Sequence, residues 1–216
     1  MLRNALALVA LVVLTACGTT SAPSAPDEAI AAARYSHAGP AAITLFTVVN
    51  VKTGSGAHSG LLINGSQRVL FDPAGSFYHP RLPERADVHH GMNDKMVAFY
   101  IDYHARVTYD VIEQTVLVPQ SVADAAIAAA YQRGPVAKSM CANSISGILA
   151  GLPGFEGIGS TWFPNKLSEG FGKLPGVTTR RSTDTDADNN HGVLLIDPDA
   201  VDPTITAATT SSRLRL

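Results

Sequence analysis

The chain has 216 residues and carries 16 basic and 18 acidic side chains, which gives a formal net charge of −2 at pH 7. A near-neutral chain lacks the excess of positive charge that nucleic-acid-binding proteins use, so we expect no nucleic-acid partner. The length suits one domain with a core of its own. We also expect no cofactor.

The N-terminus has the pattern of a secretory signal. A short segment with one basic residue, Arg3, precedes an apolar run over residues 5–14, which is too short for a stable membrane span. The run ends in Leu-Thr-Ala-Cys at residues 14–17, which resembles a bacterial lipobox. The resemblance implies that residues 1–16 are removed and that Cys17 becomes the lipidated first residue. An ordinary signal peptide that contains a cysteine is the alternative.

The resemblance to a lipobox also implies a location. Gly18, rather than an acidic residue, follows Cys17, and by similarity to known lipoproteins this favours the outer membrane of the cell envelope, with the protein facing the periplasm. We therefore expect the membrane to be bound through the lipid on Cys17. No second stretch of 18 or more apolar residues occurs, so the body of the protein is expected to be soluble and tethered.

Composition divides the mature chain of 200 residues (216 minus 16) into three parts. Residues 17–42 are rich in Ser, Thr, Pro and Ala and are predicted to form a flexible tether, with a short helix over 27–34. Residues 43–200 are predicted to form the folded domain. Residues 201–216 have the pattern of a disordered tail.

The domain begins with three predicted strands, over residues 43–50, 58–63 and 68–71, each rich in apolar or β-branched side chains. Asn-Gly at 64–65 separates the second strand from the third, and this pair between apolar runs is a strong hairpin signal. The pattern predicts an antiparallel meander with His58 near the start of its middle strand.

The middle of the domain is predicted to mix loops, helices and strands. A long loop rich in Pro, His and charge is expected over residues 76–96, followed by a helix over 96–104 and a strand over 106–118. An Ala-rich helix is predicted over 121–132, and its first residues, Ser-Val-Ala-Asp, form a variant of the capping box.

The C-terminal part of the domain gives weaker signals. A second helix is predicted over residues 141–149, stopped by nearby Gly and Pro. Residues 154–176 are expected to be irregular, with Trp162 as a packing anchor. A polar stretch follows over 178–190, and a last strand is predicted over 192–197.

Cys141 is the residue with the clearest chemical potential. Lipidation of Cys17 leaves it without a disulfide partner. At a helix start, the helix dipole and a nearby imidazolium both stabilise a thiolate, and the first-turn N–H groups can hold an oxyanion. His58 would supply the imidazolium. We therefore predict Cys141 as nucleophile and His58 as base, with a buried structural thiol and a structural histidine as alternatives.

A third polar group is expected to orient the imidazole of His58. A three-residue loop over 65–67 places Gly60 opposite Asp72, so that Asp72 shares the face of His58. A two-residue Asn-Gly turn would shift the pairing by one residue and point Asp72 away. We favour the first register; otherwise His79 or a backbone carbonyl is the expected orienting group.

The order of these features resembles a known family. A His at a strand start, a second strand ending in a polar residue, further strands, a helix and then a Cys on the next helix is similar to the circularly permuted NlpC-like (papain-like) group, which includes bacterial cell-wall amidases and lecithin:retinol acyltransferase relatives. The matching segments are Ala-His-Ser-Gly-Leu-Leu-Ile at 57–63, Arg-Val-Leu-Phe-Asp at 68–72 and Met-Cys-Ala-Asn-Ser at 140–144. They fall within residues 43–152. The resemblance implies an α+β fold, with a papain-like antiparallel sheet packed against helices.

The same resemblance implies that Cys141, His58 and Asp72 form the catalytic triad of a thiol hydrolase or acyltransferase. The expected substrates are peptidoglycan peptide amides or, second, lipid acyl groups. Met140 stands where relatives often have Asn, and Asp72 replaces a His or Glu; these departures concern the substrate more than the fold. The alternative function is a non-catalytic binding or assembly lipoprotein of the envelope with the same fold.

A rival triad uses His191, which lies fifty positions after Cys141, as in the unpermuted order of papain-like enzymes. It is less favoured because little chain follows it to complete a sheet and the strands before Cys141 would be unexplained.

Two metal sites are also less favoured. The histidines at 79, 89, 90 and 104 have irregular spacing. The acidic stretch that begins at Asp184 resembles the start of a calcium loop, but its sixth position is Asn189 and its twelfth is Leu195. A solvated acidic loop is the preferred interpretation.

Overall fold

The computed structural model describes residues 24–193, which form a sheet with helices on both faces. The strands are β1 (Ala42–Asn50), β2 (Gly56–Asn64), β3 (Arg68–Phe71), β4 (Glu84–Arg85), β5 (Val88–His90), β6 (Tyr109–Leu117) and β7 (Thr178–Ser182). The helices are α2 (Asp27–Ala32), α3 (Asp94–His104), α4 (Gln120–Arg133), α5 (Cys141–Ala150), α6 (Pro164–Phe171) and α7 (Asn190–Val193).

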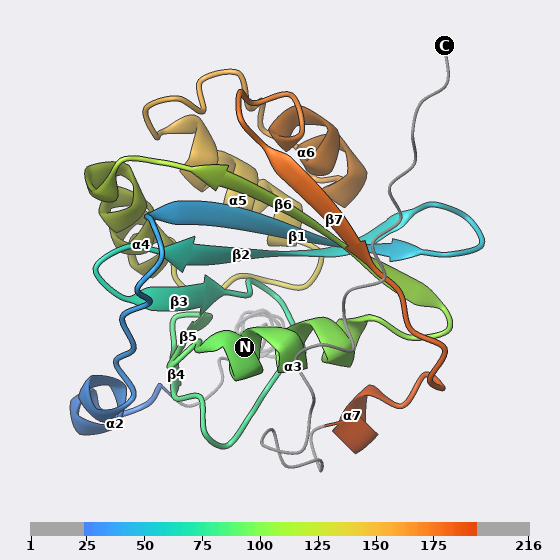
Figure 1. The fold of residues 1–216 in the computed structure, drawn as a ribbon, viewed down its shortest axis with the longest axis horizontal. Coiled ribbons are helices and arrows are strands. Elements are labelled where there is room, and N and C mark those ends of the chain that lie inside the picture. Colours follow the sequence, from blue (N-terminus) through green and yellow to red (C-terminus); the bar gives the residue numbers. More distant parts are fainter. Residues whose placement is uncertain (1–23, 194–216) are drawn as a thin grey trace, which may run out of the picture.

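The seven strands form one antiparallel sheet in the order β4-β5-β3-β2-β1-β6-β7. In Figure 1, α3 lies below β3, and α5 and α6 lie behind the sheet. The α+β class and the antiparallel sheet predicted from the sequence are confirmed.

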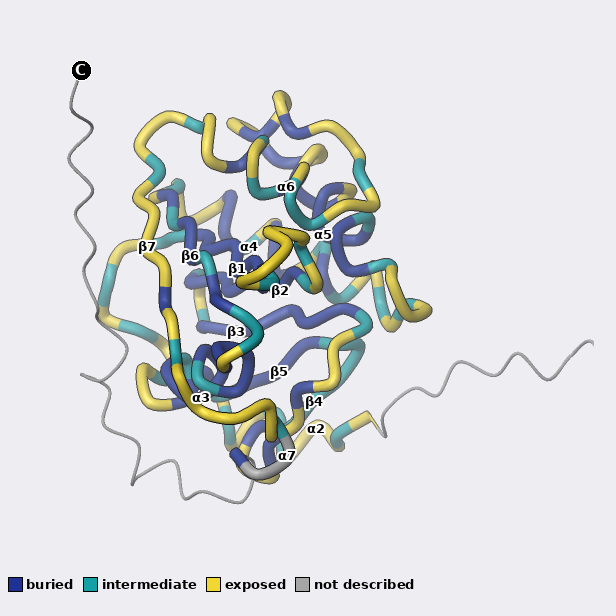
Figure 2. Tube along the Cα trace, turned by 90° about the vertical axis from the view of Figure 1, so that its right-hand side faces the viewer, coloured by how far each residue is buried: buried dark blue, intermediate teal, exposed yellow. Residues whose placement is uncertain are grey.

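Helices cover both faces because the central strands are apolar on both. Successive side chains of a strand point to opposite faces. Leu45 and Leu61 pack with residues of α4, α5 and α6, whereas Phe46 and Leu62 pack with residues of α3. Figure 2 shows the central strands in dark blue between outer loops in yellow. The sheet therefore separates two cores, and α3 and α5 lie on opposite faces.

The hairpin of β2 and β3 has the register that the candidate site requires. Asn64 pairs with Arg68 and Leu61 pairs with Phe71, so a three-residue loop joins the strands. The favoured register is confirmed. Continued by one residue, this register puts Gly60 opposite Asp72.

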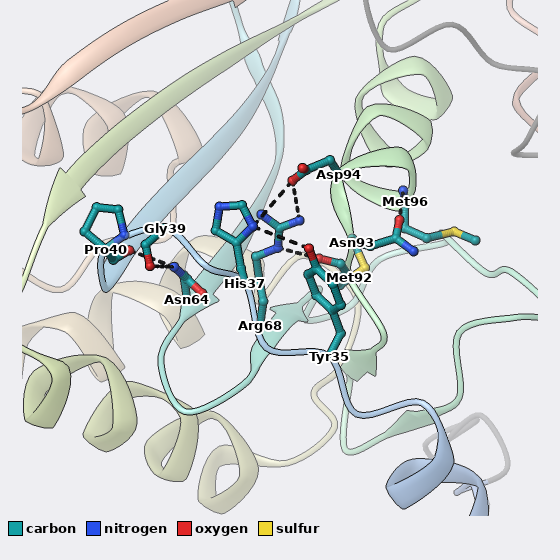
Figure 3. Close-up of polar contacts among 10 residues, drawn as sticks. All are labelled: Tyr35, His37, Gly39, Pro40, Asn64, Arg68, Met92, Asn93, Asp94 and Met96. Carbon is teal, nitrogen blue, oxygen red and sulfur yellow. Dashed lines mark hydrogen bonds and ion pairs between the residues drawn. The ribbon is translucent and has the colours of Figure 1, made fainter.

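Residues 25–42, which belong to the predicted tether, are bound to the domain. The helix predicted near residue 27 is present as α2. Asn64 donates from Nδ2 to the carbonyl of Pro40 at 2.7 Å, and Arg68 contacts Asp94 at 2.6 Å, where His37 also lies within 3.8 Å (Figure 3). From Ala25 onward this segment is therefore part of the folded body.

Three stretches predicted as irregular or left without structure contain regular elements. The predicted loop over 76–96 holds β4, β5 and the first turn of α3; the stretch 154–176 holds α6; and β7 lies in the polar stretch 178–190. The predicted anchor Trp162 is 56% exposed. These predictions were wrong, because short strands and a short helix gain their stability from neighbours rather than from a local pattern.

The start of α4 also differs from its prediction. The helix follows Pro119 and has no side-chain cap, so the capping box is absent. Asp124 instead accepts the backbone N–H of Ser66 at 2.7 Å and joins α4 to the β2–β3 loop.

The C-terminal predictions fall partly outside the described residues. Residues 192 and 193, predicted to start a strand, lie in α7, and residues 194–216 lie outside the description, as do Cys17 and the rest of residues 1–23. No helix among residues 24–193 is long and apolar enough to cross a membrane.

Candidate active site

Cys141 is the first residue of α5, as predicted, and it is 6% exposed. The first helical hydrogen bond runs from the N–H of Ser144 to the carbonyl of Met140 at 2.9 Å. The N–H groups of the residues between them precede that bond and have no partner within the helix. They also place the positive end of the helix dipole beside the sulfur.

His58 and Asp72 form a buried pair. Nε2 of His58 lies 2.7 Å from Oδ1 of Asp72, and only 14% and 1% of the two side chains are exposed. Because Nε2 is engaged by the carboxylate, Nδ1 is the ring nitrogen left to face the thiol of Cys141, with which the imidazole interacts.

β2 is longer than β3, and this difference leaves room beside β2 for Cys141. β2 pairs with β3 only from Leu61 onward, so the edge of β2 near His58 and Ser59 has no strand beside it there. The thiol of Cys141 interacts with this edge, where the backbone N–H of Ser59 lowers its pKa. The α5 helix, from behind the sheet, thereby reaches a histidine whose ring lies on the α3 side.

The electrostatics of the three groups favour an ion pair. Burial alone lowers the pKa of His58, but the charge and hydrogen bond of Asp72, together with Cys141, raise it to about 10. Burial raises the pKa of Asp72, but His58 holds it well below its usual value. Burial likewise raises the pKa of Cys141, but His58 and the N–H groups of Ser59 and Ala142 leave it lowered overall. The arrangement thus stabilises thiolate and imidazolium together.

Tyr100 is a fourth member of the site that the sequence did not indicate. Its hydroxyl, carried by α3, donates to Oδ1 of Asp72 at 2.8 Å. A Cβ on Gly60 would lie 2.3 Å from that hydroxyl, so the glycine is needed for the approach. The tyrosine lies in a helix predicted correctly, but no sequence signal identifies its contact, which depends on how α3 crosses the sheet.

His104 packs against the imidazole of His58 and is itself uncharged. Its ring stacks on that of His58 with centroids 5.6 Å apart and an interplanar angle of 11°. Its Nδ1 lies 2.9 Å from the carbonyl of Tyr100 and so donates to it. Burial lowers the pKa of His104 to about 4, which keeps this ring neutral at pH 7.

His79 and His191 are the other candidates predicted from the sequence. His79, the alternative orienting group, accepts the N–H of Arg81 at 3.1 Å and packs edge-on against Phe99. His191 lies in α7 rather than at a strand start, and its side chain is outside the description.

The metal-site alternatives gain no support. Among residues 24–193, no group of three or more histidine, cysteine or acidic side chains is placed to hold a metal ion. In the acidic stretch, Asp184 and Asp186 lie 4.0 and 3.3 Å from the guanidinium of Arg106, so a protein cation already faces them.

Two exposed aromatic residues follow a segment that is bound to α5. Trp162 and Phe163 are 56% and 68% exposed. Their segment is held to α5 through Thr161, whose N–H donates to the hydroxyl of Ser146 at 3.1 Å. This places exposed apolar side chains on the segment that is bound to α5.

Comparison with protein family models, with curated proteins and with solved structures gives no significant match. The family resemblance of the sequence motifs therefore stays a prediction.

Proposed function

We propose that this protein is a thiol-dependent hydrolase or acyltransferase of the bacterial cell envelope, with a permuted papain-like domain. The observation that supports it most is the buried bond of 2.7 Å between His58 and Asp72 beside a thiol at the start of a helix. Three such groups act together in nucleophilic catalysis. No metal or cofactor is required for this chemistry.

The proposed reaction begins with proton transfer from Cys141 to His58. The thiolate attacks the carbonyl carbon of an amide or ester, and the first-turn N–H groups of α5 stabilise the oxyanion. His58 then gives its proton to the leaving amine or alcohol. Water or another acceptor, deprotonated by His58, attacks the acyl-enzyme and releases the thiolate. Asp72 keeps the imidazole oriented and stabilises its charged form throughout.

The proposed setting follows from the N-terminal motif. Lipidation at Cys17 would anchor the protein to the outer membrane, facing the periplasm, where peptidoglycan peptides provide amide bonds and lipids provide acyl esters. We favour peptidoglycan peptides as substrate and lipid acyl groups second. The short reach of residues 18–23 would keep the domain close to the membrane.

The competing proposal is a non-catalytic binding or assembly lipoprotein with the same fold. The observation that favours it is the low exposure of Cys141, 6%, since free cysteine is among the residue types most often buried for packing alone. The reactivity of the thiol separates the two proposals.

The test is the pH dependence of iodoacetamide alkylation in the full chain with Cys17→Ser, so that Cys141 is the one remaining thiol. We expect an apparent pKa clearly below the ordinary value of about 8.5. His58→Gln should raise it, whereas His37→Gln, in the N-terminal segment, should not. A thiol that is unreactive, or indifferent to His58→Gln in a folded variant, would reject the enzyme in favour of the binding protein.

A further inference from the structure

Backbone strain is concentrated around the candidate site. Among the described residues, four other than glycine have a positive φ: Ala74 (58°), Ala86 (57°), Asp87 (59°) and Ser139 (69°). Ala74 lies two residues after Asp72, and Ser139 lies two residues before the nucleophile. Left-handed backbone is unfavourable for such residues and persists only where the surroundings hold it.

The other two strained residues form the turn between β4 and β5. Arg85 pairs with Val88, so Ala86 and Asp87 are the two central residues of a tight hairpin. Such turns need left-handed backbone at both positions and usually contain Asn-Gly. Here Ala86 takes the first position, and the turn projects Asp87 toward the site.

Asp87 joins the two segments that carry the predicted acid and nucleophile. Its carbonyl accepts the N–H of Asp72 at 2.8 Å. Its carboxylate oxygen Oδ2 lies 3.3 Å from the N–H of Ala74 and 3.4 Å from the N–H of Val136, and accepts from both. Val136 belongs to the loop over 134–140, which leads directly into α5. One side chain thus bonds to the turn after Asp72 and to the loop before Cys141.

Charge does not explain why a carboxylate occupies this position. Asp87 is partly buried, and burial together with the charge of Asp72 raises its pKa. Glu84, the other acid facing it, has a pKa raised to about 7 by burial and by the charges of Asp87 and Asp72. The N–H groups of Ala74 and Val136 act in the opposite direction. The two backbone bonds are therefore the favourable interactions of this carboxylate.

The N-terminus of α5 has no side-chain cap. Met140 is the N-cap residue, and it makes no capping hydrogen bond. We propose that Asp87 is a positioning residue that holds the loop over 134–140 against the turn at Asp72, so that Cys141 faces His58. This inference rests on the proposed function of Cys141, and it adds a residue that the triad does not include.

The experiment compares Asp87→Ala with a matched control, Asp124→Ala, in the full chain with Cys17→Ser. Asp124 also accepts a backbone N–H from a distant loop, that of Ser66 at 2.7 Å, but at the opposite end of β2 from His58. Two quantities are measured: the apparent pKa of Cys141 from alkylation, and amide hydrogen exchange at Ala74, Val136 and Ser66.

We expect Asp87→Ala to raise the apparent pKa of Cys141 by about one unit, which lowers the alkylation rate about tenfold at a pH well below that pKa, and to speed exchange at Ala74 and Val136. Asp124→Ala should speed exchange at Ser66 and leave the thiol pKa unchanged.

Three outcomes overturn the inference. The first is an Asp87→Ala variant that keeps both the thiol pKa and slow exchange. The second is faster exchange at Ala74 and Val136 without any change in the thiol pKa, which would make Asp87 structural only. The third is an unfolded Asp87→Ala variant combined with a folded Asp87→Gly variant, which lacks the acceptor but tolerates the positive φ, that has wild-type thiol pKa and exchange. Failure of the proposed function is distinguishable, because it appears in the parent protein as an ordinary thiol pKa that does not depend on His58.

Discussion

At the scale of single residues, Asp72 accepts two hydrogen bonds on one oxygen. His58 and Tyr100 both reach Oδ1, at 2.7 and 2.8 Å, whereas Oδ2 is buried without a hydrogen-bond partner among the described residues. A Cβ on Gly75 would lie 1.7 Å from Oδ2, so this oxygen packs closely against the turn. A carboxylate held in this way depends on its two donors, since a buried charge is costly to leave unpaired.

The replacement Tyr100→Phe removes one of those donors without changing the ring. We expect a loss of about 1.5–3 kcal/mol in the free energy of unfolding, the usual range for a hydrogen bond to a charged group. Urea denaturation at pH 7 measures it. Tyr131→Phe is the control, because its hydroxyl bonds to His90, whose pKa burial lowers to about 4; about 0.5–1.5 kcal/mol is expected there. Equal losses in the two variants would contradict the special role of Tyr100.

At the scale of elements, β7 shows how a polar segment becomes a strand. Its sequence, Thr-Thr-Arg-Arg-Ser, has no apolar side chain. It pairs with β6, and Arg180 and Arg181 each form an ion pair of 2.7 Å, with Glu113 and Asp110 respectively. Cross-strand charge pairs and the backbone ladder replace the apolar face that usually identifies a strand.

The two pairs should differ in their contribution to stability. Glu113 is 8% exposed and also accepts the hydroxyl of Ser182 at 2.9 Å, whereas the side chain of Arg181 is 52% exposed. We expect Glu113→Ala to cost about 1.5–3 kcal/mol and Arg181→Ala less than about 1 kcal/mol. Denaturant unfolding of both variants gives the comparison. A larger cost for Arg181→Ala would show that the exposed pair, rather than the buried acceptor, holds β7.

At the scale of the whole molecule, the buried histidines make the free energy of unfolding depend on pH, and His58 acts in the opposite direction from the others. The pKa of His58 is raised to about 10. Its contribution to the free energy of unfolding is therefore fully present below about 6.5, the pKa of histidine in the unfolded chain, and is lost as the pH rises through 10. Burial lowers the pKa of His89, His90 and His104 to about 4. Their contribution is present above about 6.5 and is lost as the pH falls toward 4. Asp72, with its lowered pKa, loses its contribution only at more acidic pH.

These signs predict a free energy of unfolding that falls above pH 6.5 because of His58 and falls below pH 6.5 because of the three neutral histidines. Glu84, whose pKa is raised to about 7, loses its contribution as the pH rises through 7 and makes the acid-side fall smaller. The measurement is urea denaturation at pH 5, 6.5 and 9 in a Cys141→Ser chain, where the thiol does not titrate. His58→Gln should flatten the fall between pH 6.5 and 9. If the free energy of unfolding falls equally steeply between pH 6.5 and 9 in His58→Gln, another group causes that fall.

The sequence by itself determined the central strands, the α5 start at Cys141 and the pairing of β2 with β3. These depend on local patterns: runs of β-branched and apolar side chains, an Asn-Gly loop and helix-stopping Gly and Pro residues. With the favoured register, the neighbourhood of Asp72 and His58 followed from the two-residue period of a strand.

Only the tertiary structure decided which other groups meet at the site. Tyr100 reaches Asp72 because α3 crosses the sheet where Gly60 leaves room, and Asp87 reaches Val136 through a strained turn between two strands too short to be predicted. The thiol meets His58 because β3 ends at Phe71, opposite Leu61, and leaves the earlier residues of β2 without a partner on that side. Each of these contacts joins segments far apart in the chain, and local periodicity determines the shape of each segment but not the place where one segment lies against another.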